Sequence, residues 1–250
     1  GEGLIPPDQF IPVAEDSGLI ESIGTWVLRE ACAQLARWST EPGLADLRIA
    51  INISPLQFRR AGFVDMVRQA LQASGLPARR VELEITESLL MQPQPDVVER
   101  LNTLAGLGIA FALDDFGTGY SSLGYLKRLP INRIKLDKSF VQDVPGNAED
   151  EAVARATLSM TKDLGLECVA EGVETRAQQD YLIANRCAFL QGYHAFLDGT
   201  VEVNGSVRYD KHNVFGGITS PRLNVLWTHN HEYNSRFGVG RGFRAPTSFF

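Results

Sequence analysis

Up to about residue 195, short apolar runs alternate with longer segments of helical periodicity, and this alternation restricts the chain to very few folds. The strand-like runs cover residues 49–54, 81–87, 109–115, 134–137, 168–174 and 188–192. The helical patterns cover residues 21–37, 57–74, 95–105, 148–163 and 175–184. Strands that alternate with helices pair in parallel, because a parallel neighbour is reached only through a crossover connection. The sequence therefore predicts an α/β domain built on a parallel sheet.

The number of strand-like runs narrows the fold further. A chain of 250 residues is long enough for a (β/α)8 barrel, in which eight parallel strands close a cylinder. Six runs are visible, and the first begins near residue 47 after a helical pattern with no strand before it. We therefore expect an α/β fold of the (β/α)8 or TIM-barrel type that lacks its first two strands.

Composition and charge exclude several classes of function. The formal net charge of −6 argues against DNA or RNA binding, which usually requires a basic surface. Cys32, Cys168 and Cys187 show no CxxC spacing and are odd in number, so we expect buried thiols in a reducing, cytoplasmic compartment. We find neither a run of about 18 apolar residues nor a signal peptide at the start of the sequence.

The strand-like runs end in polar residues that a hydrophobic strand does not require. These residues are Asn52, Glu84, Asp114, Asp115 and Glu171. The carboxyl ends of parallel strands meet at one edge of a sheet, and a buried unpaired carboxylate is costly. A shared cation would remove that cost, and a set of oxygen ligands suits Mg²⁺, Mn²⁺ or Ca²⁺. Zinc is not expected, because no histidine precedes His194.

The neighbouring carboxylates Asp114 and Asp115 suggest two metal ions rather than one. A turn after a strand can aim adjacent carboxylates at two ions about 4 Å apart, which hold the attacking and leaving oxygens of a phosphoryl displacement. The alternative is that Asp115 only caps the following turn.

Lys135 lies between two apolar residues and therefore points to the opposite face of its strand. Its ammonium could orient a hydroxide or hold a phosphate oxygen, or it could form a structural ion pair with Asp137 or another nearby carboxylate. Glu87 and Glu174 each follow a predicted ligand by three residues, and we expect them to support loops or Lys135 rather than bind metal.

At these residues the chain resembles the EAL domain family, bacterial phosphodiesterases that hydrolyse cyclic di-GMP to the linear dinucleotide pGpG. The resemblance extends over about residues 1–194. The matching stretches include Asn52-Ile53-Ser54, Glu84-Ile85-Thr86-Glu87-Ser88, Asp114-Asp115-Phe116-Gly117-Thr118-Gly119, Lys135-Leu136-Asp137, Glu171-Gly172-Val173-Glu174-Thr175 and Gln191-Gly192-Tyr193.

This resemblance implies a (β/α)8-like barrel with Mg²⁺ or Mn²⁺ in a two-metal site. The implied metal ligands are Asn52, Glu84, Asp114 and Asp115. Lys135 and Glu171 would act on the nucleophilic water, with Glu171 as general base. The implied supporting residues are Glu87, Asp137 and Glu174, and Gln191 would line the substrate site.

The sequence departs from the family in one important respect. The Glu-Ala-Leu segment that defines the family, with its metal-binding glutamate, lies upstream of the position that corresponds to Gly1. Because a missing ligand weakens a metal site, we expect little catalysis from this chain. There are two alternatives: a domain that binds cyclic di-GMP without cutting it, and a chain without a functional product. The sequence also leaves a homodimer possible.

After about residue 195 the pattern changes to alternating strands separated by polar turns. Such strands cover residues 200–209, 223–228 and 236–244 and suit an antiparallel sheet. Residues 240–247 in particular resemble TonB-dependent outer-membrane receptors, although an outer-membrane location is not expected for this chain. We therefore divide the chain into a partial EAL phosphodiesterase domain at 1–196 and a β-rich tail at 197–250. The hypothesis is that two unrelated fragments are joined.

Overall fold

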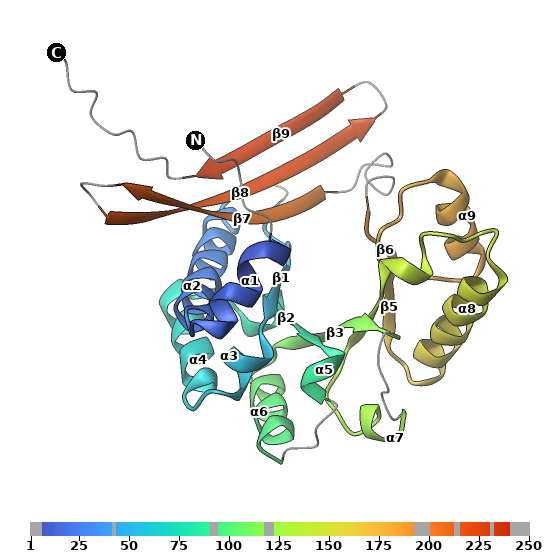
Figure 1. The fold of residues 1–250 in the computed structure, drawn as a ribbon, viewed down its shortest axis with the longest axis horizontal. Coiled ribbons are helices and arrows are strands. Elements are labelled where there is room, and N and C mark those ends of the chain that lie inside the picture. The colour runs from blue at the N-terminus through green and yellow to red at the C-terminus, as the bar shows by residue number, and fades with distance from the viewer. Residues whose placement is uncertain are drawn as a thin grey trace. The chain divides into compact units, whose positions relative to one another are not determined.

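The computed structural model describes residues 7–41, 44–90, 95–117, 123–192, 201–212, 216–230 and 233–240 (Figure 1). The chain divides into two compact units. One unit comprises Ser17–Gly192, and the other comprises Gly1–Asp16 together with Tyr193–Phe250.

The larger unit is organised around a sheet of six strands that follow one another in chain order. The strands are β1 (Ile49–Ile53), β2 (Val81–Thr86), β3 (Ala110–Phe116), β4 (Arg133–Leu136), β5 (Glu167–Ala170) and β6 (Phe189–Leu190). Every neighbouring pair is parallel. The predicted parallel α/β sheet is therefore confirmed, and each strand overlaps the apolar run that predicted it.

Helices connect the strands, as parallel pairing requires. The long connecting helices are α4 (Phe63–Ser74), α6 (Pro95–Gly106), α8 (Ala148–Asp163) and α9 (Arg176–Ala184), and the long helix α2 (Ile20–Trp38) precedes β1. Shorter elements are α3 (Pro55–Arg59), η1 (Ala78–Arg80), α5 (Glu87–Leu90), α7 (Leu123–Leu126) and η2 (Lys138–Phe140). Figure 1 shows α2, α4 and α6 near β1 to β3, and α8 and α9 near β5 and β6.

The single helix predicted at 57–74 is wrong, because the segment forms two helices, α3 and α4. Ser54 caps α3, and its side chain accepts a hydrogen bond of 3.2 Å from the backbone N–H of Leu56. Arg60 is extended and ends that helix, and Gly62 has a φ of 88° just before α4 begins. A left-handed backbone favours glycine and cannot continue an α-helix, which explains the break.

The face of the sheet that the helices cover is apolar. Ile51, Leu83, Phe111 and Ile134 are between 0% and 3% exposed, and they form one cluster with residues of α2, α4 and α6. A second cluster joins Leu136 and Cys168 to Leu158 of α8 and Leu182 of α9. Alternation along each strand places the other side chains on the opposite face, which carries the charged groups described below.

The smaller unit contains α1 (Pro7–Asp16) and three strands. The strands are β7 (Val201–His212), β8 (Gly216–Asn230) and β9 (Tyr233–Gly240), and they form an antiparallel sheet. Residues 241–247 lie outside the described residues, so the resemblance of the tail to outer-membrane receptors stays a prediction. Among the helices in the described ranges, none is sufficiently long and apolar to cross a membrane.

Candidate metal centre

The ammonium group of Lys135 lies at the centre of a buried charge cluster. Its Nζ atom is 3.0 Å from Glu84 Oε2, 3.0 Å from Asp114 Oδ1 and 2.7 Å from Glu171 Oε1. Only 6% of the Lys135 side chain is exposed, and the carboxylates are 10%, 13% and 17% exposed in the same order. The structure therefore brings together four of the predicted site residues, from β2, β3, β4 and the end of β5.

This cluster carries more negative than positive charge. Three carboxylates and one ammonium leave a formal charge of −2, and the adjacent carboxylate of Asp115 makes it −3. Burial is the largest effect that raises the pKa of Glu84 and of Glu171, and Lys135 opposes it. Burial lowers the pKa of Lys135, but the three carboxylates outweigh it and raise that pKa above its usual value, so the ammonium stays charged.

A β-bulge explains how two consecutive aspartates serve one site. Leu113 pairs with Ile134 and Phe116 pairs with Leu136, so Asp114 and Asp115 together lie opposite the single residue Lys135. An extra residue in one strand interrupts the alternation of side chains between the two faces. The bulge is therefore the local reason that both carboxylates reach the same edge of the sheet.

The backbone of Asp115 is left-handed, with a φ of 55°. Aspartate tolerates this conformation better than most residues do. Burial, followed by the charges of Asp114 and Asp137, raises the pKa of the Asp115 carboxyl group. The carboxylate oxygens of Asp114, Asp115 and Glu171 all lie within 4.8 Å of one another, which is close enough to share an ion.

The position of Glu171 is fixed by the backbone at the end of β5. Its N–H donates a hydrogen bond of 3.1 Å to the carbonyl oxygen of Leu136, which extends the pairing of β4 with β5 by one residue. Gly172 follows with a φ of 67°, and a Cβ atom there would come within 2.7 Å of Lys138 Cβ. Glycine is required at this turn for both reasons.

Asn52 and Gln191 are predicted site residues that are exposed to solvent. Asn52 lies inside β1 as the register partner of Glu84, and its side chain is exposed. Gln191 follows β6 and is also exposed, and its backbone donates to Ala170 at 2.8 Å and accepts from Val173 at 3.1 Å. Their proposed roles as ligand and substrate contact stay predictions.

The three residues predicted to support the site differ in their surroundings. Glu87 is 3% exposed, and its Oε2 atom accepts a hydrogen bond of 3.3 Å from the N–H of Gly117 in the loop after β3. Asp137 caps η2 by accepting a hydrogen bond of 2.8 Å from the N–H of Ser139, and its carboxyl group also interacts with Asp115. Glu174 is exposed.

A second charged layer lies along the same face of the sheet, and the sequence analysis did not identify it. Arg133 Nη1 is 2.9 and 2.8 Å from the two carboxylate oxygens of Glu82, and its Nη2 is 2.6 Å from Glu167 Oε2. The guanidinium also lies 4.8 Å from the centre of the Phe189 ring. Glu82 and Arg133 each precede a site residue by two positions, so the alternation already placed them on the site's face.

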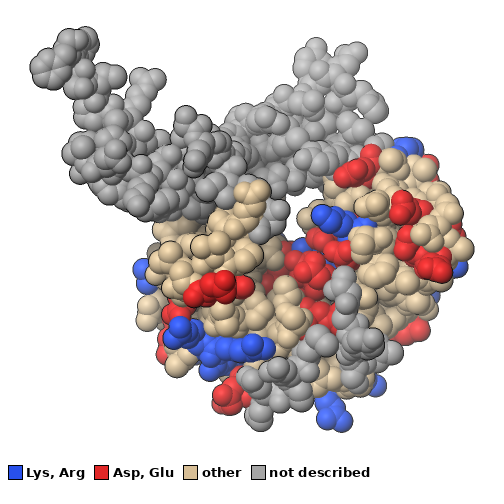
Figure 2. All heavy atoms as spheres, in the orientation of Figure 1, with Lys and Arg blue, Asp and Glu red and all other residues tan. Residues whose placement is uncertain are grey.

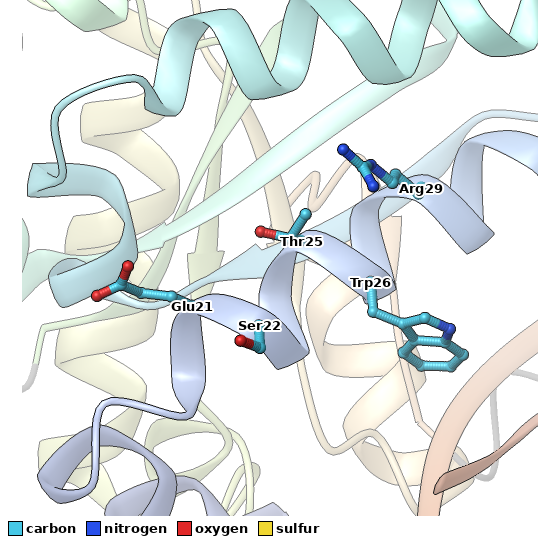
Figure 3. A pocket seen from close by; sticks show the side chains of 5 residues that line it. All are labelled: Glu21, Ser22, Thr25, Trp26 and Arg29. Carbon is cyan, nitrogen blue, oxygen red and sulfur yellow. The ribbon is translucent and has the colours of Figure 1, made fainter.

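Acidic and basic side chains gather near the middle of the face of the larger unit that Figure 2 shows. A separate hollow of about 450 Å³ is lined by five residues of α2, among them Trp26 and Arg29 (Figure 3). None of these five residues belongs to the charge cluster around Lys135, so this hollow is not part of the candidate metal centre.

Comparison with known proteins identifies relatives of the first 196 residues of the chain. A family model described as the EAL domain matches residues 1–196. The bifunctional diguanylate cyclase/cyclic di-GMP phosphodiesterase MucR of Pseudomonas aeruginosa is 47% identical over 191 residues, which are 76% of this chain and 28% of MucR. The cyclic di-GMP phosphodiesterase NbdA of the same organism is 45% identical over 192 residues, or 77% of this chain and 24% of NbdA. The chain thus spans about a quarter of the length of these relatives.

Solved structures of EAL domains and phosphodiesterases also resemble this chain. The PaMucR phosphodiesterase in complex with c-di-GMP has a TM-score of 0.74 and 46% identity, over 76% of this chain and 77% of that one. The EAL domain of Mycobacterium smegmatis DcpA has a TM-score of 0.67 and 39% identity, over 70% of this chain and 78% of that one. These similarities confirm the predicted barrel-type α/β fold.

Proposed function

Because the chain belongs to the EAL domain family, we propose that it hydrolyses cyclic di-GMP to linear pGpG with the help of Mg²⁺ or Mn²⁺. Two relatives that it resembles are named as cyclic di-GMP phosphodiesterases, and one solved structure is a complex with c-di-GMP. The observation in this chain that carries the proposal is the excess of negative charge around Lys135, at the carboxyl edge of a parallel sheet.

The residues present fit a hard divalent cation. All the candidate ligands offer oxygen, three of the carboxylates approach within 4.8 Å, and the cluster carries uncompensated negative charge. We propose that Glu84, Asp114 and Asp115 hold the metal, with Asn52 as the fourth ligand. When bound, such ions lower the pKa of water and stabilise charge on phosphoryl oxygens.

Glu171 would accept the proton of the attacking water, and Lys135 would donate hydrogen bonds near it. Burial raises the pKa of Glu171, which makes its carboxylate a stronger base for the proton of the attacking water. Lys135 stays protonated, because the neighbouring carboxylates raise its pKa, and it therefore acts as a donor rather than a base. We propose that it orients the water or holds a phosphate oxygen, with Gln191 beside the substrate.

The proposal is tested by incubating the purified chain with cyclic di-GMP and Mg²⁺ or Mn²⁺ and separating the products by chromatography. In keeping with the low catalysis expected from the sequence, we expect pGpG to form slowly, no turnover after chelation of the metal, and a further loss of about 100-fold or more in Glu171→Gln. The matched control is Glu99→Gln, which alters an exposed glutamate of α6 and is expected to have no effect. Equal rates in Glu171→Gln and the unmodified chain would contradict the proposal.

A second candidate function is binding of cyclic di-GMP without hydrolysis. The observation that favours it is that Lys135 already neutralises part of the carboxylate charge through three ion pairs. Calorimetry distinguishes the two functions, because a binding domain would show saturable uptake of the dinucleotide in the presence of a chelator and release no pGpG.

The remaining predictions concern the setting of the protein. We propose a cytoplasmic location, because Cys32, Cys168 and Cys187 are all free thiols, as in proteins of reducing compartments. A homodimer stays an open prediction that sedimentation analysis would test. The outer-membrane resemblance of the tail adds no transport function to the proposal.

A further inference from the structure

Two of the three cysteines lie next to each other at the end of the sheet. Cys168 belongs to β5, and Cys187 lies between α9 and β6. The Sγ atom of Cys187 is 3.8 Å from the carbonyl oxygen of Cys168 and 3.2 Å from that of Phe189, and the two thiols are close enough to shift each other's pKa. These two cysteines are close in space, although 19 positions separate them in the sequence.

The backbone holds this pair in place. Val169 pairs with Phe189 across β5 and β6, so Cys187, two residues before Phe189, lies one register position before Cys168 at the adjoining ends of the two strands. Arg186 has a φ of 64° where the chain reverses after α9, and the N–H of Cys187 donates a hydrogen bond of 2.9 Å to Leu182. The proximity of the thiols thus follows from strand pairing and from the end of a helix.

The two thiols have different surroundings. Cys168 is 3% exposed within the apolar cluster under α8 and α9, whereas Cys187 is only partly buried. Interaction with the Cys187 thiol, followed by burial, raises the pKa of Cys168. Interaction with the Cys168 thiol lowers the pKa of Cys187 against the effect of its burial, and the thiolate is the form that reacts with oxidants.

We propose that Cys168 and Cys187 form an oxidation site at which a peroxide produces a reversible disulfide between β5 and the segment before β6. The Cys187 sulfur attacks one oxygen of the peroxide, the O–O bond breaks, and a sulfenic acid and one water (from hydrogen peroxide) are formed. The Cys168 sulfur then attacks the Cys187 sulfur and displaces the hydroxyl group as a second water. Two thiols are oxidised by two electrons, and one peroxide is reduced.

The bridge would fasten β6 to the sheet. Within the described residues, β6 has two residues and pairs only with β5. Because the bridge closes a loop, it restricts the unfolded chain, and we expect the melting temperature to rise by about 5–10 °C. This inference does not depend on the proposed hydrolysis, since the Cys187 thiol donates to the carbonyl oxygens of Cys168 and Phe189 and not to the carboxylates around Lys135.

Cys32 is the third thiol of the chain, and we do not expect it to take part. It is 1% exposed in the cluster under α2, and burial raises the pKa of its thiol to about 11, so it should resist oxidation. The Cys32→Ser variant of the full chain contains only the proposed pair and is therefore the form to test.

The experiment treats Cys32→Ser with one equivalent of hydrogen peroxide, blocks the remaining thiols with iodoacetamide and maps peptides by mass spectrometry. We expect a linked peptide pair containing Cys168 and Cys187, a mass loss of two hydrogens, reversal by dithiothreitol and a higher melting temperature. A further Cys187→Ser change should abolish all of these results, and melting of the reduced variant verifies that it is folded. Full alkylation of both thiols, sulfinic acid at Cys187 without a bridge, or a bridge only between two chains would overturn the proposal.

Discussion

The two faces of strand β4 differ completely, although they are built from alternate residues of one short segment. Ile134 and Leu136 point to the helices and are 0% exposed within apolar clusters. Arg133 and Lys135 point the other way, and each forms ion pairs with side chains from other strands of the sheet or their ends. The strand therefore separates the packing of the fold from the chemistry of the site.

The comparison teaches which kind of residue is replaceable on each face. An apolar core accepts side chains of similar volume, because dispersion and burial are not directional. A buried ion pair depends on particular partners, and its desolvation cost can exceed the Coulomb energy that it provides. We infer that the charged face is retained for chemistry rather than for stability, and the following predictions test this division.

The largest expected effect is on catalysis and comes from Lys135→Met. This change removes the ammonium that contacts three carboxylates, so we expect kcat for cyclic di-GMP to fall by about 100-fold or more. Initial rates with Mg²⁺ measure it. Lys127→Met, at an exposed position, is the control. If Lys135→Met kept its full rate, the charged face would have no catalytic role.

The neighbouring change Ile134→Ala should lower the stability of the fold and leave the rate of hydrolysis nearly unchanged. It removes a fully buried side chain from the helix-covered face, and we expect the free energy of unfolding to fall by about 2–5 kcal/mol. The rate per folded molecule at low temperature should stay within twofold of the original, because no site residue is altered. Urea unfolding and active-site titration measure the two quantities. A large loss of rate with unchanged stability would show that the two faces are not independent.

Arg133→Met should lower the free energy of unfolding by less than Ile134→Ala does. It leaves the buried carboxylate of Glu82 without its partner, and we expect a loss of about 2–3 kcal/mol, below the value for full burial because solvent reaches 17% of the arginine side chain. Combining it with Glu82→Gln should restore most of this loss, since the only carboxylate then left without Arg133 is that of Glu167, which is 50% exposed and stays solvated. Additive losses in the double variant would contradict the assignment of Glu82 as the main partner.

The smallest effect is expected at an exposed ion pair. Arg176 and Asp180 on α9 are one helical turn apart, at 2.9 Å, with side chains 66% and 59% exposed. Solvent screens such a pair, so Asp180→Asn should change the free energy of unfolding by at most about 0.5 kcal/mol in urea titrations. A loss as large as that of Arg133→Met would contradict the view that burial determines the importance of a charge in this protein.

The sequence predicted the parallel sheet and most helices correctly, but it did not predict local breaks in the backbone. Alternating strands and helices determined the parallel sheet, and the limits of α8 were predicted to the residue. The break at Gly62 was missed, because apolar periodicity continues across it while the backbone conformation does not. Periodicity reports which side a residue faces and is insensitive to a local left-handed turn.

Within the site, the sequence predicted the type of residue better than the arrangement. Polar strand ends identified Glu84, Asp114 and Glu171, which the fold brings to Lys135. The ion pairs of Arg133 with Glu82 and Glu167 were not predicted, because only the polar residues at strand ends were considered and these residues lie earlier in their strands, on the same face. The bulge at Asp115 depends on the register of two strands, which no single run of residues encodes.

The central claim is that the carboxylates around Lys135 hold a divalent cation, and direct titration with Mn²⁺ monitored by electron paramagnetic resonance tests it. The account predicts saturable binding, at least about tenfold weaker in Asp114→Asn. It also predicts unchanged binding in Glu167→Gln, because that half-exposed residue pairs with Arg133 rather than Lys135. No saturable binding, or equal affinity in Asp114→Asn and the unmodified chain, would contradict it.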